Sequence, residues 1–214
     1  MSTKNDVGVV IKAPNFSTAE FKIVGTSPYV QNKFSAKARQ TMKETQEAGS
    51  RSRSKRKRKA KDFTKCYEDA MHKMVDGGHG IPAPAFRNAM IDACRMVGFK
   101  MTHARCSVFV VADGFDADDA TPLVRITKGE PQYLELAVRL ETGVCDIRPR
   151  PMWEPGWEAT VQIRFDTDQF SVSDVANLLL RAGEQVGVGE GRPFSKNSKG
   201  MGWGMFRLVE EGEG

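Results

Sequence analysis

Cysteine and histidine are scarce in this sequence, and no two of them have the spacing of a metal site. The 214 residues include four cysteines and three histidines, without any C-x-x-C or H-x-x-x-H pair. Cys94 and Cys106 fall among apolar residues, which predicts buried, reduced thiols and no disulfide framework. The one zinc-binding combination that the sequence offers is widely dispersed: Cys66, His72, His79 and His103. We therefore expect no metal ion and no cofactor.

Long apolar runs are also missing. No stretch approaches the roughly 18 residues that span a bilayer, and no secretory core follows Met1 before Lys12 and Pro14. The sequence thus predicts a cytoplasmic protein without membrane contact, located in the bacterial host cell if a phage encodes it. Hydrophobic residues make up 40% and charged residues 28% of the chain, which is typical of a globular protein and excludes disorder throughout.

Recognised catalytic motifs are absent as well. None of the three histidines has a Ser, Cys or carboxylate partner in a known motif, and no phosphate-binding G-x-x-x-x-G-K-[ST] loop occurs. We therefore expect that the protein is not an enzyme. A metal-independent or Asp-dependent ribonuclease is the exception left open, and its candidate residues are His79, before a helix, and Asp113 or Asp116, after a strand.

Positive charge, in contrast, is abundant in one segment. The chain has 32 Lys and Arg against 27 Asp and Glu, a net charge of +5. Residues 51–61 read RSRSKRKRKAK and contain eight basic residues, so the rest of the chain is net acidic. Because such a block repels itself, residues 49–61 are predicted to be a flexible segment that contacts a polyanion. The alternative is a solvated linker that only aids solubility.

Apolar periodicity predicts the order of helices and strands. Prolines at 82 and 84 favour a helix start, and apolar residues at helical spacing continue to Gly98. Ser107–Ala112 is continuously apolar, as in a central strand covered on both faces. The further expected helices are Ala36–Ala48, Asp62–Met74 and Phe170–Gly183, and the further expected strands are Val7–Ile11, Glu20–Val24, Leu123–Ile126, Tyr133–Leu140, Ala159–Phe165 and Trp203–Val209.

This order predicts an α+β fold. Reduced to its strongest elements it reads βαββαβ, which a ferredoxin-like sheet of the RRM type satisfies with both helices on one face and extra strands. We expect a single domain over residues 1–214, with a helical and basic insertion at 36–76. Arg139, Arg148 and Arg150 lie near Trp153 and Trp157, where exposed tryptophans would stack on bases and buried ones would pack in the core.

Glycine is concentrated near the C-terminus. Glycines at 187, 189, 191, 200, 202 and 204 allow a ligand to approach the backbone, and Arg192, Lys196 and Lys199 supply cations beside them. This segment is therefore a candidate anion-binding loop. The alternative is a tight loop that packs the preceding helix against the last strand, above all at Gly187 and Gly204.

Three segments together resemble the RAMP superfamily of CRISPR-associated proteins. Gly80–Met90 resembles the start of the first helix in that family, and Gly25–Phe34 is similar to the loop after its first strand. Gly200–Gly204, beside Arg192, Lys196 and Lys199, is similar to its C-terminal glycine-rich loop. The resemblance covers about a quarter of the chain. It implies an RRM-type core that binds RNA without sequence preference, and in the backbone-subunit branch it implies head-to-tail assembly along the strand.

The sequence thus predicts a single-stranded nucleic-acid-binding protein, RNA more than DNA, that oligomerises as a filament or ring along the strand. The predicted binding residues are Lys33, Arg51, Arg53, Lys55, Arg56, Lys57, Arg58, Lys59, Arg87, Arg192, Lys196, Lys199, Gly200 and Gly202. The alternative function is a structural or interaction protein that assembles through the same sheet, with a phage-encoded antagonist of host defence as one version.

Overall fold

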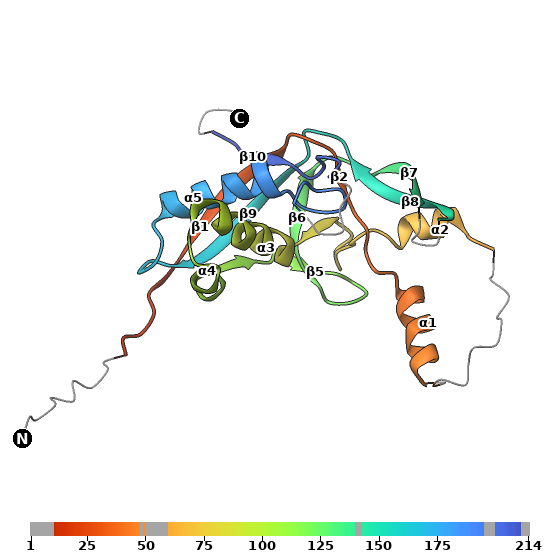
Figure 1. The fold of residues 1–214 in the computed structure, drawn as a ribbon, viewed down its shortest axis with the longest axis horizontal. Coiled ribbons are helices and arrows are strands. Elements are labelled where there is room, and N and C mark those ends of the chain that lie inside the picture. The colour runs from red at the N-terminus through yellow and green to blue at the C-terminus, as the bar shows by residue number, and fades with distance from the viewer. Residues whose placement is uncertain (1–10, 48, 50–59, 140–142, 195–199, 211–214) are drawn as a thin grey trace, which may run out of the picture.

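Two antiparallel β-sheets with helices against the larger one form the protein (Figure 1). The computed structural model describes residues 11–47, 49, 60–139, 143–194 and 200–210. The strands are β1 (Phe16–Gly25), β2 (Tyr29–Val30), β3 (Gly80–Pro82), β4 (Val108–Val111), β5 (Gly114–Phe115), β6 (Pro122–Lys128), β7 (Gln132–Arg139), β8 (Cys145–Trp153), β9 (Glu158–Asp166) and β10 (Phe206–Leu208). The α-helices are α1 (Ala36–Glu47), α2 (Phe63–Glu68), α3 (Ala83–Ala93), α4 (Met101–Ser107) and α5 (Val172–Arg181).

The larger sheet has the order β10-β1-β9-β6-β3. β1 and β9 pair along their whole length, from Phe16 opposite Asp166 to Val24 opposite Glu158. On its other edge β9 pairs first with β6 and then with β4, so these two strands occupy successive parts of the same edge. The presence of both helices and antiparallel strands agrees with the predicted α+β fold class.

The core lies between this sheet and the helices α3 and α5, which cover the same face (Figure 1). Along β9 the predicted alternation is confirmed, because Ala159, Val161, Ile163 and Phe165 are buried while the residues between them are not. The opposite face of β9, from Glu158 to Asp166, carries polar side chains. The half-exposed strand predicted at Tyr133–Leu140 is confirmed as β7, with alternate exposed and half-buried residues.

β4 differs from the prediction of a central strand covered on both faces. Among the described residues it pairs only with β9, and of its four residues only Val108 is buried. The prediction is wrong because the run is apolar for another reason. Phe109 lies on the outer face of the sheet, where its ring is 5.9 Å from that of Phe16. Apolar contacts at a sheet edge produce the same sequence pattern as a buried central strand.

The smaller sheet has the order β2-β8-β7 and contains a strand that the sequence did not indicate. β8 passes through Pro149 and Pro151, which lack the N–H that a strand normally donates. Trp153 at its end and Trp157 after it are fully buried, each with its ring 5.5 Å from the Tyr29 ring. The prediction that these tryptophans stack on bases is therefore wrong, and the alternative prediction, that they pack in the core, is confirmed.

The two core helices begin as predicted. α3 starts after Pro82, and a 3₁₀ turn leads from it to Gly98, whose φ of 71° ends the helix. Ser171 and Asp174 form the capping box of α5. Gly183 does not end that helix, because a π-helical turn continues to Val186. Gly183 instead permits close packing, since an added Cβ would lie 2.1 Å from the Phe206 carbonyl oxygen.

The insertion between β2 and β3 is only partly helical. The helix predicted at Ala36–Ala48 is confirmed as α1, but within Asp62–Met74 only Phe63–Glu68 is helical. α1 projects away from both sheets (Figure 1). The basic residues 51–59 and the strand residues 7–10 lie outside the described residues, and Ile11 is in no strand.

The two cysteines with apolar neighbours in the sequence, Cys94 and Cys106, have different environments. Cys94 is buried, and burial raises the pKa of its thiol. Cys106 is exposed on α4, contrary to the prediction. Its apolar neighbours belong to β4, which begins two residues later, so the helix turns the thiol outwards.

Candidate nucleic-acid interface

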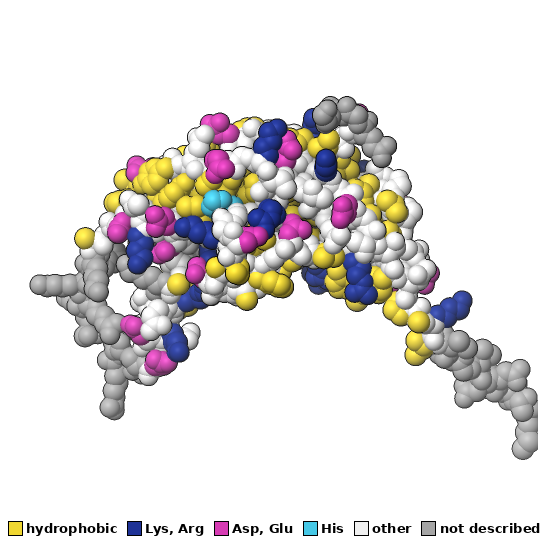
Figure 2. All heavy atoms as spheres, turned by 180° about the vertical axis from the view of Figure 1, so that it is seen from behind, with side chains coloured by type: hydrophobic (Ala, Val, Ile, Leu, Met, Phe, Trp, Pro, Cys, Tyr) yellow, Lys and Arg dark blue, Asp and Glu magenta, His cyan; other side chains and the backbone are white. Residues whose placement is uncertain are grey.

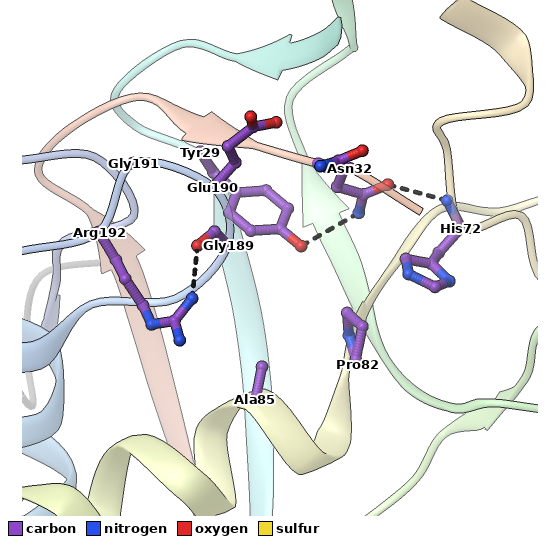
Figure 3. A pocket seen from close by; sticks show the side chains of 10 residues that line it. Tyr29, Asn32, His72, Pro82, Ala85, Gly189, Glu190, Gly191 and Arg192 are labelled. Carbon is purple, nitrogen blue, oxygen red and sulfur yellow. Dashed lines mark hydrogen bonds between the residues drawn. The ribbon is translucent and has the colours of Figure 1, made fainter. Parts of the chain in front are cut away.

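A cavity of about 380 Å³ lies where four distant segments meet (Figure 3). Its lining residues come from the segment that includes β2, from the start of α3, from the glycine-rich loop and from the chain before β3. They are Tyr29, Gln31, Asn32, His72, Pro82, Ala85, Gly189, Glu190, Gly191 and Arg192. Arg192 and His72 lie on opposite sides, with Pro82 and Ala85 between them (Figure 3).

Gln31 joins its own segment to β3 and to the chain before β3. Its buried Nε2 donates to the carbonyl oxygen of Gly80 at 2.8 Å and to the Tyr29 hydroxyl at 3.2 Å, while its Oε1 accepts from the backbone N–H of His72 at 2.8 Å. Burial raises the pKa of the Tyr29 phenol, and the Gln31 hydrogen bond offsets only part of that rise, so Tyr29 stays neutral. The Gln31 side-chain amide therefore donates and accepts hydrogen bonds within the protein, and these bonds hold this wall of the cavity in place.

The glycine-rich loop lies directly on β2. The N–H of Glu190 donates to the Val30 carbonyl oxygen at 2.9 Å, and Gly189 has a φ of 81°. A Cβ on Gly189 would lie 2.6 Å from that same oxygen, so only glycine fits. Arg192 Nη1 donates to the carbonyl oxygen of Gly189 at 3.0 Å, which holds the guanidinium at the cavity (Figure 3).

Glu190, the acidic residue of this loop, pairs with Arg150 of the smaller sheet. The Glu190 carboxylate accepts a hydrogen bond from Arg150 Nε at 2.5 Å, and only 8% of the Arg150 side chain is exposed. The carboxylate points away from Arg192 and His72 (Figure 3). Glu190 therefore repels an anion in the cavity less than an unpaired carboxylate would.

An ion cluster lies behind His72. Asp116 Oδ1 accepts from Lys33 Nζ at 2.6 Å, Asp116 Oδ2 is 2.8 Å from His72 Nδ1, and Lys33 also contacts Asp118 at 2.7 Å. Burial raises the pKa of the Asp116 carboxyl, but the hydrogen bonds from Lys33, the Asp118 N–H and His72 together hold it below its ordinary value. Burial likewise lowers the pKa of Lys33, and the two aspartates more than offset this and raise it.

Metal binding is not assigned to this cluster. His72, Asp116 and Asp119 have atoms of the ligand type within 4.8 Å of one another. Both Asp116 oxygens are already used, because Lys33, His72 and the backbone N–H of Asp118 donate to them. The dispersed zinc combination is not brought together among the described residues, since of its four members only His72 belongs to this group.

The predicted catalytic candidates have separate roles. His79 lies beside Trp153, where burial lowers the pKa of its imidazole. Asp113 accepts from the backbone N–H of Arg125 at 2.7 Å, and Asp116 belongs to the ion cluster. The histidine that contacts Asp116 is His72, not His79.

The predicted binding residues do not all meet at the cavity. Arg192 lines it, whereas Lys33 has only 2% of its side chain exposed and faces Asp116 and Asp118, so the expectation of an exposed cation there is wrong. Gly200 and Gly202 have φ values of 61° and 74° and do not line it. Outside the described residues lie Arg51, Arg53, Lys55, Arg56, Lys57, Arg58, Lys59, Lys196 and Lys199.

Arg87 supports the edge of the larger sheet. Its Nε donates to the carbonyl oxygen of Val108 at 2.9 Å, its Nη2 donates to that of Arg105, and its guanidinium lies over the Phe109 ring. The residue therefore satisfies backbone groups between α4 and β4. It does not line the cavity.

Sequence reasoning missed His72, Gln31 and Asn32 as cavity residues. Gln31 and Asn32 fall in the Gly25–Phe34 segment that the resemblance included, which was the available signal. His72 had no such signal, because its contact with Asp116 spans 44 positions along the chain. Only folding brings these two residues together.

A second cavity of about 560 Å³ adjoins the first, since Asn32 lines both. Lys61, Arg148 and Arg150 are among its lining residues, and Lys61 Nζ contacts Asp146 at 2.8 Å. Hydrogen bonds from Lys61 and then Arg148 hold the pKa of the Asp146 carboxyl below its ordinary value. The end of the basic segment is thus fixed beside this cavity.

Basic and acidic side chains are interspersed over the described surface seen from behind (Figure 2). The excess of positive charge therefore belongs to one segment rather than to that face. Within the described residues, no helix has the length and apolar character needed to cross a membrane. No family model matches the chain, and a search of curated proteins found no match.

Proposed function

We propose that the protein binds single-stranded nucleic acid, RNA in preference to DNA, without sequence preference, at the cavity between β2, α3 and the glycine-rich loop. One observation carries this proposal. The segments Gly25–Phe34 and Gly80–Met90 and the basic residue Arg192, which are far apart in the sequence and belong to the resemblance to the RAMP superfamily, all contribute to the same cavity.

The strand order supports a ferredoxin-like core. In the order β10-β1-β9-β4 all neighbours are antiparallel, and α3 and α5 connect β1 towards β4 and β9 to β10. This is the arrangement expected for βαββαβ with both helices on one face. β6, β3, β5 and the smaller sheet are additions to it.

The chemistry of the cavity suits a sugar-phosphate backbone. Arg192 supplies a cation, Asn32 supplies an exposed amide, and Gly189 and Gly191 bring the loop backbone to the wall of the cavity. Contacts of this kind attract phosphates and do not distinguish bases. The adjoining cavity, lined by Lys61 and Arg148, extends the path for a strand as far as Lys61, the last basic residue of the basic segment in the sequence.

Assembly along the strand is the second part of the proposal. All described side chains of α1 are exposed or half-exposed, and Met42 is 55% exposed. An isolated helix of 12 residues is marginal in water. α1 is therefore suited to contact a neighbouring copy on the same strand. The same exposed helix favours the second candidate function, an interaction protein that binds another protein through α1.

Arg192→Gln tests the site. We expect this variant to bind a labelled oligouridylate about tenfold more weakly, because a charge-assisted contact to a phosphate is lost. Arg87→Gln is the matched control, and it should lower the melting temperature while leaving the affinity unchanged. Fluorescence anisotropy with oligouridylate and oligothymidylate gives both affinities. Absence of binding by the wild-type protein, or an unchanged affinity of Arg192→Gln, would overturn the proposal.

A further inference from the structure

His72 is fixed in orientation at the cavity wall although the sequence gives it no motif. Its backbone N–H donates to Gln31, and its Nδ1 lies 2.8 Å from Asp116 Oδ2, so the ring is held from two sides. The side chain is 13% exposed and lines the cavity. The exposed part of the ring therefore belongs to the site rather than to the open surface.

The hydrogen bonds determine which ring nitrogen faces a ligand. Lys33 donates to Asp116 Oδ1, and Asp116 Oδ2 accepts from His72 Nδ1–H. In the neutral imidazole Nε2 then carries the lone pair, and no hydrogen bond of Nε2 is present within the described residues. A second proton on the ring would turn Nε2 into a donor without disturbing the contact with Asp116.

Charged groups lie on both sides of the His72 ring. Behind the ring three carboxylates, Asp116, Asp118 and Asp119, face two cations, Lys33 and Arg39, so one negative charge is in excess. Across the cavity Glu190 is paired with Arg150, and Arg192 is cationic. Lys73, the next residue in the chain, is exposed. An anion in the cavity would add negative charge on the open side of the ring.

We infer that His72 is a phosphate-binding residue that takes up a proton when the anion enters. The imidazolium Nε2–H then donates to a phosphate oxygen from the side opposite Arg192, while Asp116 keeps hold of Nδ1–H. This inference rests on the proposed function, and it adds a regulation by pH to the same site. The ligand group is the phosphodiester, which stays anionic throughout the relevant pH range.

Proton uptake fixes the sign of the pH dependence. Histidine changes charge between pH 5 and pH 8. Affinity for the phosphodiester should therefore be highest in the acidic part of this range and fall as the pH rises. Uptake of one proton limits the fall to about tenfold per pH unit.

The experiment measures binding of labelled oligouridylate at constant ionic strength from pH 5.5 to pH 8. Wild-type affinity should fall about threefold or more per pH unit in the steepest part. His72→Gln should bind with a weak and nearly flat pH dependence. His103→Gln is the matched control, because His103 is exposed on α4 and does not line the cavity, and it should behave as the wild type.

Calorimetry in buffers of different ionisation enthalpy supplies a second readout that does not depend on a variant. The wild type should take up a fraction of one proton per bound site near pH 7, and His72→Gln should take up none. Binding with a flat pH profile and no proton uptake would overturn this inference and leave the proposed function intact. Absence of binding at every pH would overturn the proposed function itself.

Discussion

Gly204 and Val188 are in direct backbone contact where the glycine-rich loop closes on itself. The Val188 N–H donates to the carbonyl oxygen of Gly204 at 3.0 Å, and a Cβ added to Gly204 would lie 1.7 Å from the Val188 carbonyl oxygen. Gly202, two residues earlier, also has a positive φ, but an added Cβ would meet nothing within 4 Å. The two glycines therefore differ in what requires them.

We expect Gly204→Ala to destabilise the fold by about 3 kcal/mol or more, because the backbone of Val188 cannot move aside. Gly202→Ala should cost about 1 kcal/mol, the strain of a positive φ without a clash. Denaturant unfolding of the two variants measures the difference. Equal losses of stability would show that the contact at Gly204 relaxes easily.

The buried ion pair predicts a strong effect of Lys33→Met. This change leaves Asp116 without its main partner, and an uncompensated buried charge costs about 3 to 5 kcal/mol. Lys128→Met is the matched control, because Lys128 pairs with Glu158 on the surface, where both side chains are well exposed. The control should change the free energy of unfolding by less than about 1 kcal/mol.

Asp116 also predicts a sensitivity to acid. Because the folded protein holds the pKa of this carboxyl below its ordinary value, the contribution to stability is complete above about pH 4 and is lost as the pH falls through the folded value. Denaturant unfolding between pH 7 and pH 2.5 should show this loss. Asp116→Asn should be less stable at neutral pH and lose less on acidification. An identical acid dependence of both proteins would contradict this assignment.

The basic segment predicts the salt dependence of binding. Each phosphate contact to a single strand contributes about −0.7 to the slope of log affinity against log salt. Replacing the basic residues by Gln should therefore flatten the slope and weaken binding to all sequences alike. The positions to change are Arg51, Arg53, Lys55, Arg56, Lys57, Arg58 and Lys59. The control is Lys22→Gln with Lys128→Gln, at two lysines that line neither cavity, and it should leave the slope unchanged. An unchanged slope in the basic-segment variant would make the segment a passive linker.

Self-association should appear when a long single strand is added. Sedimentation velocity is expected to show assemblies that grow with strand length, since heterologous contacts propagate instead of closing. Met42→Glu on α1 should shorten these assemblies, whereas Met96→Glu, at a similarly exposed methionine, should not. A strict monomer in both states would leave a protein that binds the strand one copy at a time.

Local chemistry was enough to predict several elements. Ser171 and Asp174 indicated the start of α5, and the alternation from Ala159 to Phe165 indicated which face of β9 is buried. The prolines before Phe86 placed the start of α3. These signals depend on residues within one or two turns of each other, so the sequence contains them completely.

Only the tertiary structure decided the composition of the cavity. Lys33 and Arg87 are both cations in the sequence, yet Lys33 neutralises the buried Asp116 and Arg87 donates to backbone carbonyls at β4. The contact of His72 with Asp116 and that of Arg150 with Glu190 each join positions 40 or more residues apart. Charge and polarity are properties of a residue, but whether a charge meets a partner or a ligand depends on which distant segments fold against it, and that is decided by packing of the whole chain.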